Sequence, residues 1–124
     1  MLLAAARRPP SRAELQAALW TWRASSRAHR QLLAGGLQAV ALPAVPRGAD
    51  GGVRGVEAML RRRSATCLER ALVRQAWLAA HGERQQIVIG VRRDDAEFGA
   101  HAWLEREAAA DATGFTELMR HPGP

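Results

Sequence analysis

The chain contains a single cysteine, Cys67, and this residue stands where a helix is expected to begin. Thr66 and Glu69 form an S/T-x-x-E pattern immediately before an apolar run, which predicts a capping box with Thr66 as the N-cap. Cys67 then occupies the first helical position, where unpaired backbone N–H groups and the helix dipole favour thiolate over thiol. The same N–H groups are suited to stabilise an oxyanion. The pattern therefore predicts an activated nucleophile, the alternative being a small core residue.

His101 is the candidate general base for this nucleophile. It lies in a segment built mainly from small and apolar residues, on the strand face that also carries Trp103. A helix followed directly by an antiparallel hairpin brings its own start beside the second strand, so Cys67 and His101 are expected to meet. A third group must orient the imidazole. Asp111 is preferred over Glu105, because Glu105 lies two pleats along the same strand and approaches the ring poorly.

Helices are expected to form the N-terminal part of the chain. Ser11 and Glu14 make a second capping-box pattern, and apolar residues follow at helical spacing. Trp20 and Trp22 on this helix are interpreted as packing residues. Glycine and proline crowd together after the helix, which predicts a loop before the second half of the chain.

The second half is expected to hold the catalytic elements. Residues 67–81 are apolar around most of the circumference, which predicts a buried helix that ends at Gly82. β-branched residues alternate along 86–92 and predict a strand. Residues 98–105, after a polar turn, are expected to return as its antiparallel partner. The last segment, 115–120, is interpreted as a short helix.

Composition limits the possible functions. All 18 of the Lys+Arg residues are arginines, which excludes lysine phosphate loops, Schiff bases and lysine general bases. One cysteine cannot form an internal disulfide or, with the scattered histidines, a metal site. The net charge of +6 is accompanied by only 5% aromatic residues, so specific nucleic-acid binding is not favoured. The apolar N-terminal run is too short for a signal peptide or a membrane span, so a cytoplasmic protein is expected.

Three short blocks carry a resemblance to a known family. They read CLERAL at 67–72, IVIGVR at 87–92 and AHAWLE at 100–105. In this order they resemble the transglutaminase-like cysteine protease family, and within it the leader peptidases of lasso-peptide biosynthesis. The resemblance implies an α+β fold of the papain/transglutaminase type. In that fold the nucleophile begins a buried helix packed on a small antiparallel sheet.

The resemblance also implies a role for each site residue. Cys67 would attack the amide between leader and core in a ribosomally made precursor peptide, and His101 would serve as general base and then acid. Asp111 would complete a Cys-His-Asp triad. The implied partners are the precursor peptide, a separate leader-recognition protein and an ATP-dependent cyclase. No cofactor, metal, nucleic acid or membrane is expected.

The chain is expected to form a single domain over residues 1–124. Its expected parts are a helical N-terminal part at 11–42, a loop or linker at 43–55 and a catalytic core at 56–121. Two other functions remain open from the residues. One is an acyl transferase or amidase that uses the same nucleophile, and the other is a non-catalytic, arginine-rich binding module.

Overall fold

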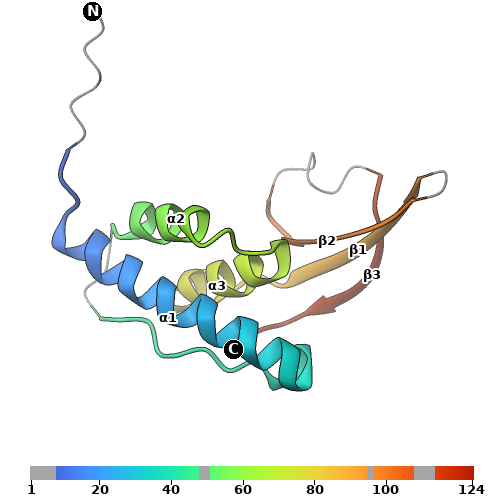
Figure 1. The fold of residues 1–124 in the computed structure, drawn as a ribbon, viewed down its shortest axis with the longest axis horizontal. Coiled ribbons are helices and arrows are strands. Elements are labelled where there is room, and N and C mark those ends of the chain that lie inside the picture. Colours follow the sequence, from blue (N-terminus) through green and yellow to red (C-terminus); the bar gives the residue numbers. More distant parts are fainter. Residues whose placement is uncertain (1–7, 48–50, 95–96, 108–113) are drawn as a thin grey trace, which may run out of the picture.

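Two layers make up the fold, a group of helices and a small antiparallel sheet (Figure 1). The computed structural model describes residues 8–47, 51–94, 97–107 and 114–124. The helices in these ranges are α1 (Arg12–Gly35), the short 3-10 helix η1 (Leu37–Ala39), α2 (Val53–Arg62) and α3 (Cys67–Ala80). The strands are β1 (Ile87–Asp94), β2 (Glu97–Leu104) and β3 (Thr116–His121). The predicted α+β architecture with a helical N-terminal part is confirmed.

Both long helices begin with the predicted capping boxes. At α1 the Ser11 hydroxyl accepts the Glu14 N–H at 3.1 Å, and the Glu14 carboxylate accepts the Ser11 N–H at 2.9 Å. At α3 the Thr66 hydroxyl and the Glu69 carboxylate exchange the equivalent bonds, both at 3.2 Å. Each box satisfies two N–H groups that the helix itself leaves unpaired. Cys67 is therefore the first residue of α3, as the sequence predicts.

The first apolar cluster lies where α1 packs on α2. A Cβ atom at Gly55 would lie 2.1 Å from the backbone oxygen of Glu14, so any side chain there would push the two helices apart. α2 begins at Val53, inside the predicted loop, because the chain must turn back along α1 at this contact. The buried members of the cluster come from α1, α2 and α3 and are Ala17, Trp20, Ala24, Val56, Leu60, Val73 and Trp77.

The two tryptophans of α1 have different surroundings. Trp20 is buried, its ring centroid lies 5.7 Å from that of Trp77, and its indole N–H donates to the Pro43 oxygen at 2.9 Å. Trp22 is 46% exposed, so its interpretation as a packing residue is wrong. The buried face of α1 carries mainly small side chains, among them Ala24, and these allow close contact with α2 and α3. Trp22 does not lie on that face and is therefore left partly in solvent.

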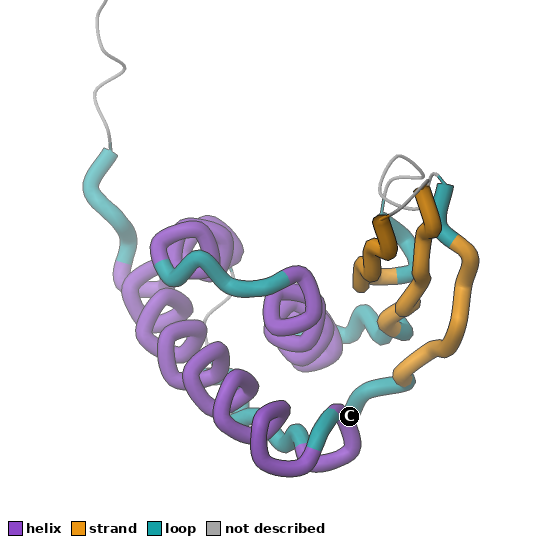
Figure 2. The backbone as a smooth tube through the Cα atoms, turned by 45° about the vertical axis from the view of Figure 1, so that its right-hand side comes forward, coloured by secondary structure: helices purple, strands orange, loops and turns teal. Residues whose placement is uncertain are grey.

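α3 lies between α1 and the sheet (Figure 2). Its contact with the sheet is made chiefly on β2, and the second apolar cluster joins these elements. The buried members of that cluster are Ala28, Ala71, Leu72, Ile87, Ala102 and Leu104. The structure thus brings the start of the helix beside the second strand, which is the arrangement predicted for Cys67 and His101.

The strand order is β2-β1-β3, and both pairs are antiparallel. The β1–β2 hairpin confirms the prediction for these two segments. The predicted short helix at 115–120 is wrong, because Thr116–His121 forms β3 along the second edge of β1. A six-residue helix has little stability of its own, whereas the open edge of β1 offers backbone groups that need partners. Among the described helices, none has the length and apolar character that crossing a bilayer requires.

Candidate active site

Cys67 is a half-buried free thiol at the start of α3. The Thr66 cap fixes the direction in which the chain enters the helix. The side chain packs against the second apolar cluster, which includes Ala102 of β2. The cysteine is therefore held by a core helix on one side and faces the sheet on the other.

A cavity of about 280 Å³ opens beside the thiol. Its lining comes from α2–α3, β2 and the segment after β2, and comprises Ala65, Cys67, Arg70, Ala71, Arg74, His101, Ala102 and Glu107. Cys67 and His101, which lie far apart in the sequence, are thus placed on the wall of one cavity. A space shared by a thiol and an imidazole is what thiolate chemistry requires.

Aromatic rings surround His101. Its ring centroid lies 5.7 Å from that of Trp103, with the two rings stacked, and 5.5 Å from that of Phe115. Gly90 is the residue opposite His101 in the β1–β2 register. A Cβ atom at Gly90 would lie 2.8 Å from Cη2 of Trp103 and 3.1 Å from Cβ of Phe115. The missing side chain of this glycine therefore gives the two aromatic residues the room to hold the imidazole.

The imidazole of His101 makes no hydrogen bond to the thiol of Cys67 in the described residues. Alternate residues of a strand point to opposite faces, so His101 starts on the face opposite Ala102, which packs on α3. Catalytic hydrogen bonds in unliganded enzymes commonly tighten only in the substrate complex.

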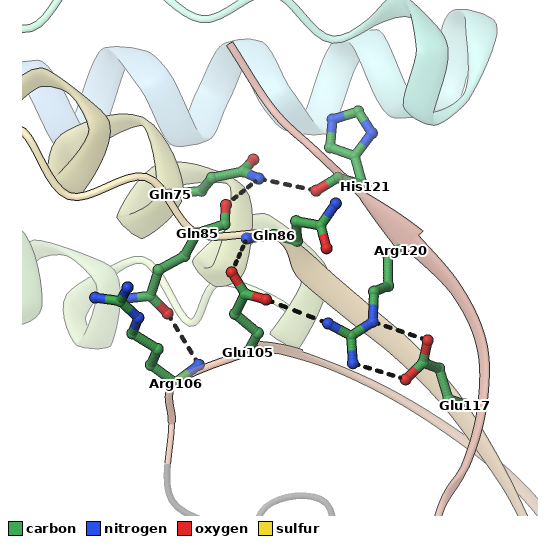
Figure 3. Close-up of polar contacts among 8 residues, drawn as sticks. All are labelled: Gln75, Gln85, Gln86, Glu105, Arg106, Glu117, Arg120 and His121. Carbon is green, nitrogen blue, oxygen red and sulfur yellow. Dashed lines mark hydrogen bonds and ion pairs between the residues drawn. The ribbon is translucent and has the colours of Figure 1, made fainter.

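The acidic member of the predicted triad has two candidates. Asp111 lies outside the described residues. Glu105 accepts the Gln86 N–H at 3.1 Å through one oxygen and pairs with Arg120 at 3.2 Å through the other (Figure 3). Both of its oxygens therefore serve the contact between β2, β1 and β3, and neither reaches the imidazole.

Glu107 is a cavity residue that the sequence interpretation missed. Its carboxylate accepts a hydrogen bond from Arg74, which also pairs with Glu57 at 3.2 Å. Glu107 is therefore already neutralised by an arginine on α3. Glu107 lies in a turn after β2, and no sequence motif surrounds it. The sequence therefore contains no sign that it lines the cavity and pairs with Arg74.

His29 is a second residue whose place the sequence did not show. Its Nδ1 lies 2.8 Å from Oε2 of Glu69, the carboxylate oxygen that the capping box does not use. α1 therefore contacts the capping box of α3. Ser25, Arg63 and Ser64 help to line a smaller cavity of about 240 Å³ at this contact. His29 is thus part of the support beneath the first turn of α3, on which Cys67 stands.

A cysteine that begins a core helix shares a cavity with a histidine on the adjoining strand, and these are the two residue types that an enzyme with a thiol nucleophile uses. A family model described as the transglutaminase-like superfamily matches residues 2–120. The chain therefore belongs to the transglutaminase-like superfamily, whose members are commonly cysteine proteases or acyltransferases. The comparisons with curated proteins and with solved structures find no match. The transglutaminase-like superfamily to which the three sequence blocks point is confirmed, and the leader-peptidase role stays a prediction.

Proposed function

We propose that this protein is a cytoplasmic cysteine peptidase that removes the leader from a ribosomally made lasso-peptide precursor. The observation that carries the proposal is the shared cavity of Cys67 and His101 in a chain of the transglutaminase-like superfamily. The CLERAL, IVIGVR and AHAWLE blocks supply the resemblance to leader peptidases. Hydrolysis at a thiol also agrees with the cysteine proteases found in this superfamily.

In the proposed first step, Sγ of Cys67 attacks the carbonyl carbon of the leader–core amide while its proton passes to His101. The oxyanion that forms accepts hydrogen bonds from N–H groups at the start of α3. The N–H of Glu69 is already donated to Thr66, so those of Cys67 and Leu68 are the available donors. His101 then protonates the leaving amine of the core as the C–N bond breaks, and a thioester to the leader remains.

In the proposed second step, a water molecule attacks the thioester as His101 takes one of its protons. The C–S bond breaks as the proton on His101 passes to Sγ, so the leader leaves as a carboxylic acid and both the thiol and the neutral imidazole are restored. Asp111 is the group proposed to orient the imidazole and stabilise its charged form. A separate protein is proposed to recognise the leader, and an ATP-dependent cyclase to close the released core.

The test is to incubate the protein with a lasso precursor and its leader-recognition protein, and to follow the products by mass spectrometry. We expect free leader and core peptides from the wild-type chain. The Cys67→Ala variant is expected to lose at least about 1,000-fold in rate, because the step has no other nucleophile. The matched control is Arg12→Ala, which changes the residue after the cap of α1 and is expected to cleave normally. Full cleavage by Cys67→Ala would overturn the proposal.

An acyltransferase is the second candidate, because this superfamily also contains acyltransferases. Such an enzyme forms the same thioester but transfers the acyl group to an amine instead of water. Adding a primary amine to the reaction separates the two. A leader whose mass includes the amine supports transfer, whereas a leader that ends in a carboxylic acid supports hydrolysis.

A further inference from the structure

The cavity beside Cys67 contains a positive charge that the proposed mechanism does not use. Arg70 lies one turn after Cys67 on α3 and lines the same cavity. Its Nε atom is buried, and no hydrogen-bond partner for this atom is found among the residues that the structure describes. A buried donor without a partner is costly, and such atoms are few in native proteins. Turning the side chain into the cavity would expose this N–H to an acceptor on a ligand and remove that cost.

The other charged groups around this cavity are already paired with one another. Arg74, the second arginine in the lining, lies between Glu57 and Glu107 and pairs with both. Glu107 is the lining carboxylate in the described part of the chain, and Arg74 already occupies it. Arg70 is therefore the cation of this cavity that has no counter-charge among the residues the structure describes. The charged residues that line the cavity, Arg70, Arg74 and Glu107, sum to one positive charge, which favours an incoming anion over an incoming cation.

We infer that Arg70 makes this cavity a carboxylate-binding subsite, and that the substrate carries an Asp or Glu side chain close to the bond that Cys67 attacks. A guanidinium holds a carboxylate through two parallel N–H···O bonds, which fixes orientation as well as charge. Binding one turn along α3 would place the scissile carbonyl at the thiol. Only the assignment of the carboxylate to a peptide depends on the proposed function. The preference for an anion does not.

Alkylation of the single cysteine tests the anion preference directly. Sγ of Cys67 displaces iodide from either iodoacetate or iodoacetamide, and the two reagents differ chiefly in charge. We expect the ratio of the iodoacetate rate to the iodoacetamide rate to fall about tenfold in Arg70→Gln. The reason is that the variant loses a charge-assisted hydrogen bond to the carboxylate of iodoacetate. Arg70→Lys is expected to keep part of the ratio, because it keeps the charge but loses the planar fork.

The matched control is Arg62→Gln. It removes the same charge from an exposed arginine on α2, which lines a different cavity, and is expected to leave the ratio within about twofold. An equal change in both variants would overturn the inference, since it would reflect net charge alone. An unchanged ratio in Arg70→Gln would overturn it too.

A measurement on the wild-type protein avoids any dependence on how the variants fold. Succinate is expected to slow alkylation of Cys67 by iodoacetamide in a saturable manner, whereas succinamide at the same concentration is expected to have no effect. Equal behaviour of the two compounds would contradict the subsite.

Synthetic peptides that span a leader–core junction connect the subsite to the proposed peptidase. With the wild-type chain, replacing a Glu beside the scissile amide by Gln is expected to lower kcat/KM about tenfold. With Arg70→Gln the two peptides should be cleaved equally. Absence of cleavage with a retained alkylation ratio would reject the peptidase and leave the subsite. Cleavage without discrimination between the peptides would reject the subsite and leave the peptidase.

Discussion

α1 and α3 begin with the same four-residue device but face different surroundings. At α1 the carboxylate of Glu14 lies 3.6 Å from Arg8 and 3.7 Å from Arg54. The pKa of Glu14 is lowered, first by its hydrogen bonds to Ser11 and then by these arginines. At α3 the corresponding carboxylate, Glu69, contacts His29 of α1 instead. Both carboxylates are buried, but the first faces two arginines and the second faces a histidine.

The difference shows that a capping box fixes where a helix begins but does not make that position reactive. The residue after the cap is exposed Arg12 in α1 and half-buried Cys67 in α3. Both starts line a cavity, but in the described part of the chain the cavity at α3 is the one that also has a histidine-bearing strand in its wall. The chemistry is therefore set by what the tertiary structure places opposite the helix end.

The largest effect is expected from replacing His101, which lines the cavity at the start of α3, and the matched comparison is His29, which contacts the cap. His101→Ala is expected to lower kcat/KM for leader cleavage at least 100-fold, an effect on the order of that of a lost general base. His29→Ala, on the side away from the cavity, is expected to cost less than about threefold, because it removes only support for the cap. Steady-state kinetics on both folded variants provides the test. Comparable losses in the two would contradict the assigned base.

Gly90→Ala tests the support of His101 from the sheet. The new methyl group would collide with Trp103 and Phe115, so we expect unfolding to become easier by about 1–3 kcal/mol. Gly99→Ala is the matched control, because a Cβ there meets only the backbone oxygen of Arg92 at 3.9 Å. Urea unfolding of both variants gives the free energies. Equal stability of the two variants would show that Trp103 and Phe115 leave room for a methyl group at Gly90.

Removing each cap hydroxyl sharpens the comparison between the helix starts. Ser11→Ala and Thr66→Ala are each expected to lower stability by about 1 kcal/mol, since each leaves one helix N–H unpaired. Only Thr66→Ala is expected to slow alkylation of Cys67 by iodoacetamide, because only this cap positions the thiol. Thermal unfolding and alkylation rates measured on the same samples check both parts. A slower reaction in Ser11→Ala would remove the distinction.

The smallest expected effect concerns acid stability at α1. Because the pKa of Glu14 is lowered in the folded protein, its ionised form contributes stability above its ordinary value of 4.5. That contribution is lost as the pH falls through the lowered value. Glu14→Gln should therefore flatten the acid limb of the stability curve measured by urea unfolding. Arg54→Gln should change it less, since the ion pairs are a minor cause of the shift.

Local sequence patterns were sufficient for the elements that carry the proposed nucleophile and base. The Thr66–Glu69 box places Cys67 at the start of α3, and both partners of each hydrogen bond lie within four residues. Alternation of β-branched residues likewise predicts β1, and a nearby polar turn predicts its hairpin with β2. Such features depend on neighbours in the sequence, so a single chain reveals them.

Features that depend on distant partners could not be predicted in this way. The segment after Phe115 has helix-forming residues, yet the free edge of β1 pairs with it as β3. Trp22 follows helical spacing, but which face of α1 is buried depends on where α2 and α3 pack. The pairing of Glu107 with Arg74 joins positions separated by a whole hairpin. No short pattern records contacts of this kind.

Gln75 of α3 links the local unfolding of the helix to that of the sheet. Its buried amide donates to the backbone oxygens of Gln85 at 2.9 Å and of His121 at 3.0 Å, before β1 and at the end of β3 (Figure 3). Peeling β3 away would leave one of these donors unsatisfied inside the protein. We therefore expect α3 and β3 to exchange their amide hydrogens as one cooperative unit. The helix that carries the thiol would then open only together with β3.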